Sequence, residues 1–158
     1  MQIDLNSFCD PGRYKFARPW SEGVYTYAAN GHILIRVPRD RLIPVSAEAH
    51  RITDNAEVVE WFDLEPLYGW HALPVVTVAR IECPSCHGVQ GCDCGYCDGD
   101  GSYPEDIEPV VVGGVPFSSH VLEKLGVLPA CEIGVNDMTS PSRIRFKGGD
   151  GLIMPIKP

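Results

Sequence analysis

The chain has 158 residues and a mass of 17.3 kDa, which is the size of one ordinary domain with its own core. Hydrophobic residues make up 44% and charged residues 22%, and these globular proportions exclude wholesale disorder. The apolar runs are only a few residues long and the start lacks the pattern of a secretory signal. We therefore expect a cytoplasmic protein without membrane contact.

The net charge of −8 is concentrated in the centre of the chain. Residues 52–108 contain twelve acidic residues and a single basic one, Arg80. This region would repel a phosphate backbone, so we interpret it as a solvated acidic face. The basic residues that could meet a nucleic acid lie elsewhere: Arg13, Lys15, Arg18, Arg36, Arg39, Arg41, Arg143, Arg145 and Lys147.

Three elements are predicted in the first part of the chain. Ile3, Leu5 and Phe8 suggest an opening strand. Two β-branched and aromatic runs, 24–27 and 33–37, flank Asn30-Gly31 and predict a hairpin. Residues 56–62 fit a helix, although a short strand through 58–62 remains open. The helix could be capped by Thr53, Asp54 or Asn55.

The second part of the chain predicts several strands and one helix. A β-branched run at 75–81 leads into a group of cysteines, and 110–112 reads as a strand before a Gly-Gly turn. Ser118 or Ser119 can cap a helix that ends at Gly126. Strands are then expected at 131–135, 143–146 and 152–156, the last two joined by a glycine-rich turn at 147–151.

Five of the seven cysteines lie between positions 83 and 97. Two C-x-x-C pairs, Cys83/Cys86 and Cys94/Cys97, can each form a tight turn that directs two thiolates at one point, and together they complete a tetrahedral zinc shell. Cys92 or His87 could replace one of these ligands. Four protein ligands leave no open position for water, so we expect a structural rather than catalytic zinc. The isolated Cys9 and Cys131 are expected in the core.

Three other kinds of site use similarly spaced cysteines, and the sequence disfavours each of them. The sequence Cys83-Pro-Ser-Cys-His matches a haem attachment pattern, but a second C-x-x-C nearby is unexpected there. A thioredoxin-like redox pair needs a helix after the cysteines, which the following glycines disfavour. A zinc deaminase needs H-x-E upstream of the cysteines, and neither His32 nor His71 provides it.

The glycine spacing resembles the DnaJ-type cysteine-rich zinc domain. C94-G-Y-C-D-G-D-G matches its C-x-x-C-x-G-x-G repeat, and C83-P-S-C-H-G-V-Q matches all but the final glycine. Such a domain has four repeats and two zincs, whereas this chain has two repeats and room for one. The resemblance implies an inserted zinc hairpin at 82–106, without the chaperone role.

The C-terminal part resembles the closing unit of a DNA polymerase sliding-clamp domain. F117-S-S-H-V-L-E-K-L-G-V-L-P, C131-E-I-G-V-N-D, S140-P-S-R-I-R-F and G151-L-I-M-P-I carry this similarity, and A28-A-N-G-H-I-L-I-R-V is similar to an earlier strand pair of that family. The resemblance implies a single α+β domain over 1–158 with two βαβββ halves, near 1–65 and 72–158. A clamp ring needs six such domains and basic inner helices, which this chain does not offer.

These patterns favour a non-enzymatic binding or interaction module that contains zinc and is linked to nucleic-acid metabolism. The small architecture suggests a phage or prophage setting. We expect a homo-oligomer, most simply a dimer, and a protein partner is compatible with the sequence; a nucleic-acid partner has less support. The alternative function is a redox or other enzyme that uses the C-x-x-C pairs.

Overall fold

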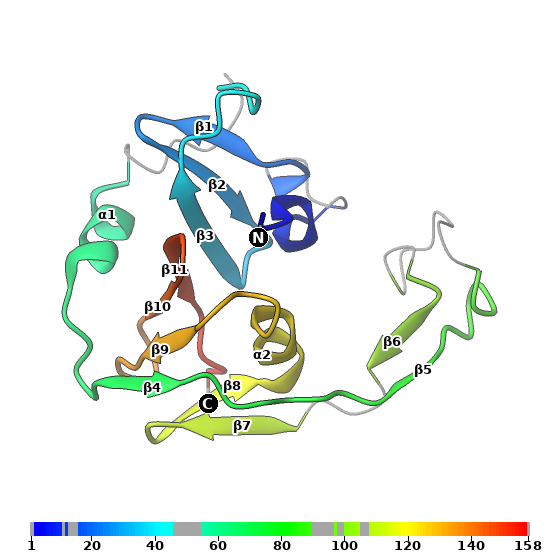
Figure 1. Cartoon of the computed structure of the whole chain (residues 1–158). Coiled ribbons are helices and arrows are strands. Elements are labelled where there is room, and N and C mark those ends of the chain that lie inside the picture. The colour runs from blue at the N-terminus through cyan, green and yellow to red at the C-terminus, as the bar shows by residue number, and fades with distance from the viewer. Residues whose placement is uncertain are drawn as a thin grey trace.

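The computed structural model describes residues 2–10, 12, 16–45, 55–89, 97, 100–104 and 108–157. Within them the fold is α+β, with a seven-stranded antiparallel sheet, two α-helices and two separate two-stranded hairpins (Figure 1). The strand order in the large sheet is β1-β2-β3-β11-β10-β9-β4. Its strands are β1 (Trp20–Glu22), β2 (Tyr25–Ala29), β3 (Ile33–Pro38), β4 (Trp70–Ala72), β9 (Glu132–Gly134), β10 (Ser142–Phe146) and β11 (Gly149–Ile153).

The hairpin predicted around Asn30-Gly31 is confirmed. Strands β2 and β3 pair antiparallel, with Ala29 opposite Leu34. The side-chain oxygen of Asn30 accepts hydrogen bonds from the backbone amides of His32 and Ile33, both at 2.9 Å. Gly31 has a φ of 89°, a conformation that glycine adopts without steric cost. Local turn chemistry therefore fixes this register.

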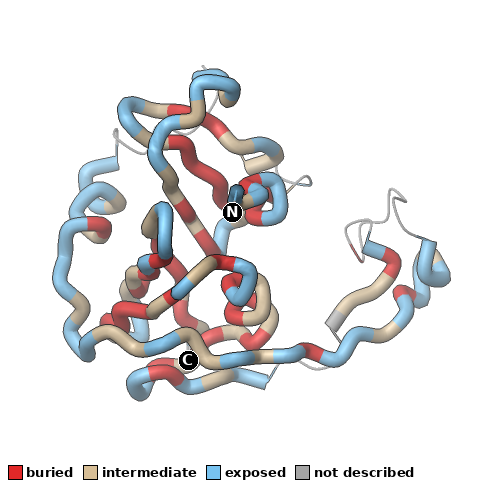
Figure 2. The backbone as a smooth tube through the Cα atoms, viewed as in Figure 1, coloured by how far each residue is buried: buried red, intermediate tan, exposed pale blue. Residues whose placement is uncertain are grey.

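Alternation along the strands gives the sheet two apolar faces. Ile33 and Ile35 of β3 belong to the larger core, whereas Leu34 packs into a second cluster on the opposite face. Helix α2 (Ser119–Leu125) and the 3₁₀-helix η1 (Leu5–Phe8) supply residues of the larger core. Buried residues are concentrated in the strands and in α2 (Figure 2).

Helix α1 (Ala56–Asp63) contributes to the second cluster. Asn55 is its N-cap, and its side-chain oxygen accepts a hydrogen bond from the amide of Val58 at 3.2 Å. This confirms the predicted helix over the alternative strand. Phe62 is buried and packs with Trp20, Tyr27 and other residues of the second cluster.

The predicted opening strand at residues 3–8 is wrong, because these residues include η1. The side chain of Asp4 accepts a hydrogen bond from the amide of Asn6 and caps the first turn. In a 3₁₀-helix, residues three apart lie on the same side, so Leu5 and Phe8 are buried together. The same apolar spacing that suggested a strand is thus satisfied by a helical turn.

The predicted strand at 75–81 is mostly wrong. Only β5 (Arg80–Glu82) is a strand, and it pairs with β6 (Ser102–Pro104), not with the large sheet. Residues 73–79 belong to no strand. The valine-rich composition was compatible with a strand, but these residues lack a neighbouring strand to pair with within the described part of the chain.

The C-terminal part follows the prediction with one shift. Helix α2 ends at Gly126 as expected, although Ser118 at the N-cap makes no side-chain capping bond. Val110–Val112 lies in β7 (Pro109–Val112), which turns at Gly113-Gly114 into β8 (Val115–Ser118), a strand the sequence did not predict. Strands β9 and β10 lie close to their predicted positions, and β11 begins at Gly149 rather than Leu152.

The order of elements matches a βαβββ unit only in the second half. There, β8 is followed by α2 and then by β9, β10 and β11. In the described part of residues 1–65, three strands precede α1 instead of following a helix, so the order expected for the first half is not observed. Neither helix described here has the length and hydropathy of a membrane span.

Candidate metal centre

The cysteines at the predicted zinc site extend from a short antiparallel ladder. In the β5–β6 hairpin, Arg80 lies opposite Pro104 and Glu82 opposite Ser102. The amide of Cys83 then donates to the carbonyl of Gly101 at 2.9 Å, which continues the ladder by one residue. The hairpin stands apart from the large sheet at the right of Figure 1. The hairpin therefore brings the two ends of the cysteine segment, at Cys83 and Gly101, next to each other.

Three thiols meet at the end of this ladder. The sulfur atoms of Cys83, Cys86 and Cys97 all lie within 4.8 Å of one another, and those of Cys86 and Cys97 are 3.6 Å apart. A tetrahedral zinc site with Zn–S bonds of about 2.3 Å has sulfur–sulfur separations of about 3.8 Å, whereas a disulfide measures about 2.05 Å. The spacing therefore fits three ligands of one metal ion rather than a covalent bridge.

The turn after Cys83 is closed by backbone hydrogen bonds. The amide of His87 donates to the carbonyl of Cys83 at 2.8 Å, and the amide of Val89 donates to that of Cys86 at 3.3 Å. His87 and Gly88 have positive φ values of 54° and 79°. These left-handed residues turn the chain sharply after Cys86, so its thiol can face the same point as that of Cys83.

Gly101 holds the second turn against the first. Its amide donates to the sulfur of Cys97 at 3.3 Å, the contact expected to orient a ligating thiolate. With a φ of 75°, a Cβ at Gly101 would lie 2.8 Å from the carbonyl oxygen of Gly88. Only glycine allows the two turns to approach this closely.

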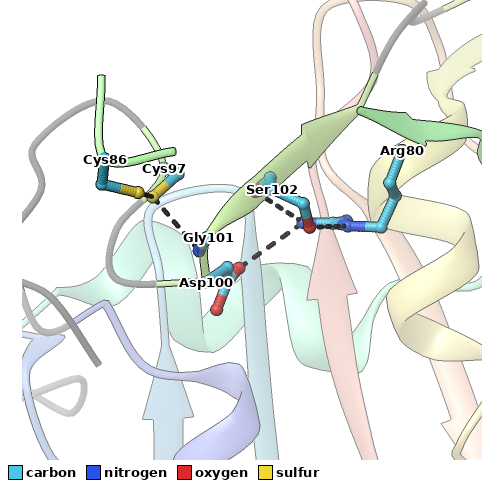
Figure 3. A network of polar contacts seen from close by, with 6 residues as sticks. All are labelled: Arg80, Cys86, Cys97, Asp100, Gly101 and Ser102. Atoms are coloured by element: carbon cyan, nitrogen blue, oxygen red, sulfur yellow. Dashed lines mark hydrogen bonds and ion pairs between the residues drawn. The ribbon is translucent and has the colours of Figure 1, made fainter. Parts of the chain in front are cut away.

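Arg80 joins the two strands of the hairpin to one side of the thiols (Figure 3). Its guanidinium donates to the Ser102 hydroxyl at 3.1 Å and to the Ser102 carbonyl at 3.2 Å, and lies 3.5 Å from an Asp100 carboxylate oxygen. Sequence reasoning did not assign Arg80 to the site. The available signal was its position as the single basic residue between 52 and 108, three residues before Cys83.

The structure brings together three of the four predicted ligands. Cys94, the fourth, lies outside the described residues, as does Cys92. His87, the other alternative ligand, does not join the cluster. Cys83 and Cys97 are buried and Cys86 is half-buried. Burial, with a smaller contribution from the adjacent thiols, raises the pKa of Cys83 to about 11.

Several of the basic residues that the sequence offered to a nucleic acid are already engaged. The guanidinium of Arg36 donates twice to the Asp150 carboxylate, at 2.7 and 3.0 Å, and lies over the ring of Phe62. Arg145 pairs with Glu132 at 2.6 Å. These cations stabilise the sheet face on which they lie, which reduces what they can offer to phosphates.

The chain matches no family model, no curated protein and no solved structure. The function is therefore inferred from the geometry of the chain itself.

Proposed function

We propose that this protein is a non-enzymatic binding module in which a zinc ion stabilises the β5–β6 hairpin for contact with another protein. The observation that carries the proposal is the convergence of Cys83, Cys86 and Cys97 within 4.8 Å. A zinc held by these thiolates and a fourth protein ligand has a closed shell, so it would stabilise the fold without activating water. Cys94 is the fourth ligand that the sequence favours.

The hairpin has few other means of stabilisation. Two-stranded hairpins are marginal in water without further packing, and β5 and β6 have only three residues each. Metal binding contributes directly to the folding of such small units. The proposed role of the zinc is therefore to keep the hairpin in one conformation as a recognition surface.

The charge of the central region supports a protein partner. Residues 52–108 carry a net charge of −11, and the side chain of Asp100 on the hairpin is 67% exposed. An excess of acidic side chains complements a basic protein surface and repels a phosphate backbone. The pairing of Arg36 and Arg145 with carboxylates points in the same direction.

A clamp-like scaffold is the finer architectural proposal. The order β8-α2-β9-β10-β11 supports it, because a strand, a helix and three antiparallel strands form the unit that the sequence resemblance implied. Strand β3 pairs with β11 and so joins this unit to the N-terminal strands. Under this proposal the link to nucleic-acid metabolism runs through protein contacts at a clamp-like body rather than through encirclement of DNA.

Metal analysis of the purified protein tests the zinc proposal. We expect one zinc per chain, lost in Cys97→Ser, with the β5–β6 hairpin losing its NMR dispersion while the large sheet stays folded. Cys131→Ser is the matched control, because Cys131 is also buried but lies outside the cluster; it should retain the zinc. A metal-free protein that cycles a Cys86–Cys97 disulfide would instead establish the redox alternative.

A further inference from the structure

A cavity lies where four distant segments of the chain meet, and it does not include the cysteine cluster. Its volume is about 740 Å³, within the range of small-molecule sites. The 3₁₀-helix η1, the turn between β2 and β3, the β5–β6 hairpin and α2 all contribute to its wall. Its lining includes Asn6, Asn30, Arg80, Asp100, His120 and Lys124.

The carboxylates on this wall are engaged. Asp100 pairs with Arg80 at 3.5 Å. Glu123 accepts a hydrogen bond from the backbone amide of Val78. Asp10 accepts one from the amide of Gly12 at 2.9 Å. Each of these three carboxylates therefore has at least one partner among the protein's own donors.

Three side chains on the same wall, in contrast, still offer hydrogen-bond donors to a ligand. Lys124 has no carboxylate within ion-pair distance among the residues that the structure describes. The oxygen of the Asn30 side chain is used by two backbone amides, which leaves its NH₂ group to donate. Asn6 lies on the same wall, and no hydrogen bond of its side-chain amide is found within the described part of the chain. A ligand with several acceptor oxygens would complement these three donors.

The electrostatic environment at His120 supports a negatively charged ligand. Burial lowers the pKa of His120, and the charges of Lys124 and Arg80 lower it further. The carboxylates of Glu123 and Asp100 raise it by less. Among the charges around His120, those of Lys124 and Arg80 therefore have a larger effect on its pKa than those of Glu123 and Asp100. Among the described residues, the other titratable groups on the wall are Cys9, Asp10 and His32.

The composition of the wall excludes two other kinds of ligand. Among the described residues, the cysteine cluster is the only convergent group of three or more metal-ligating side chains, so the acids and imidazoles here do not form a metal site. Among the described residues the wall has no Phe, Tyr or Trp that could stack on a nucleobase.

We propose that this cavity binds a small non-aromatic oxyanion, a molecule that carries phosphate or carboxylate groups, with Lys124 as its charge partner and the amides of Asn6 and Asn30 as hydrogen-bond donors. The β5–β6 hairpin forms one side of the cavity through Arg80 and Asp100. The site would therefore place a small-molecule ligand next to the proposed zinc hairpin.

NMR titration of the full-length, zinc-loaded protein tests this inference. Inorganic phosphate and citrate are added in turn at constant ionic strength, with sodium chloride as the balancing salt. We expect saturable shifts of the amides around Lys124 and a rise in the pKa of the His120 ring, because a bound anion stabilises the imidazolium form. Tighter binding of one of the two probes assigns the site to phosphates or to carboxylates.

Two lysine variants give the matched comparison. Lys124→Gln should weaken binding by about 10-fold or more, because it removes a charge-assisted hydrogen bond. Lys147→Gln makes the same charge change in the β10–β11 turn, outside the cavity, and should leave the affinity unchanged. Shifts that stay linear to about 50 mM of both probes, well above a millimolar Kd, would overturn the proposal. Equal loss of affinity in the two variants would also overturn it.

Discussion

The close contact between Gly88 and Gly101 gives the sharpest test of how the metal centre is built. In Gly101→Ala the new Cβ would lie 2.8 and 2.9 Å from the carbonyl oxygen and carbon of Gly88. These are backbone atoms, so relief requires the two cysteine turns to move apart. The thiols of Cys86 and Cys97, one on each turn, would then separate from their 3.6 Å spacing.

The expected magnitude follows from two contributions. A non-glycine residue at a φ of 75° costs about 1–2 kcal/mol. Steric overlap in a packed region costs about 1–3 kcal/mol more. The sum, about 2–5 kcal/mol, corresponds to a loss of zinc affinity of roughly 30-fold at the lower end.

Gly88→Ala separates these contributions at the same site. Gly88 has a similar φ of 79°, but its added Cβ would meet only the Glu82 side chain, at 3.2 Å. That side chain can move, so only the conformational cost of about 1–2 kcal/mol should remain. Zinc affinity is measured for both variants by competition with a chromophoric chelator. Equal losses in Gly88→Ala and Gly101→Ala would refute the argument that backbone contact between the turns shapes the site.

Three further predictions concern the rest of the molecule. Asp150→Asn should lower the free energy of unfolding, measured in urea, by about 1–3 kcal/mol, because it leaves the largely buried Arg36 guanidinium without its carboxylate. Glu132→Gln changes an exposed ion pair and should lower it by at most about 1 kcal/mol, so equal effects of the two variants would contradict this ranking. Burial raises the pKa of Cys9 to about 11 and that of Cys131 to about 12, so both thiols are almost fully protonated at pH 8. Their alkylation, followed by mass spectrometry, should be roughly 100-fold or more slower than that of a free thiol and should accelerate as the pH rises. Fast labelling of both cysteines in the folded protein would be inconsistent with this burial. Finally, β1 and β4 form the two edges of the described sheet, and exposed edges favour pairing with a second copy. Sedimentation should therefore detect a homodimer. A strictly monomeric protein at about 100 μM would exclude a homodimer of micromolar affinity.

The sequence by itself determined the elements whose causes are local. Asn30-Gly31 specified the β2–β3 turn because the asparagine side chain bonds to the next amides and glycine accepts the positive φ. Asn55 capped α1 through a contact three residues away. The two C-x-x-C pairs, Cys83/Cys86 and Cys94/Cys97, predicted a shared metal site, since each C-x-x-C turn is a short-range geometry. The described residues include three of these four cysteines, and their thiols converge.

Only the tertiary structure decided how distant segments pair. The glycines after Lys147 predict one long turn, yet Gly149 and Gly151 lie inside β11. Glycine is needed at both positions because a Cβ on either would meet a backbone carbonyl of β3. Strands β1 and β4 have three residues each and depend on partners in β2 and β9. The cavity beside α2 likewise combines Asn6, Arg80 and Lys124, which the sequence separates by up to 118 positions. Such contacts depend on chain packing, which residue patterns within a short window do not encode.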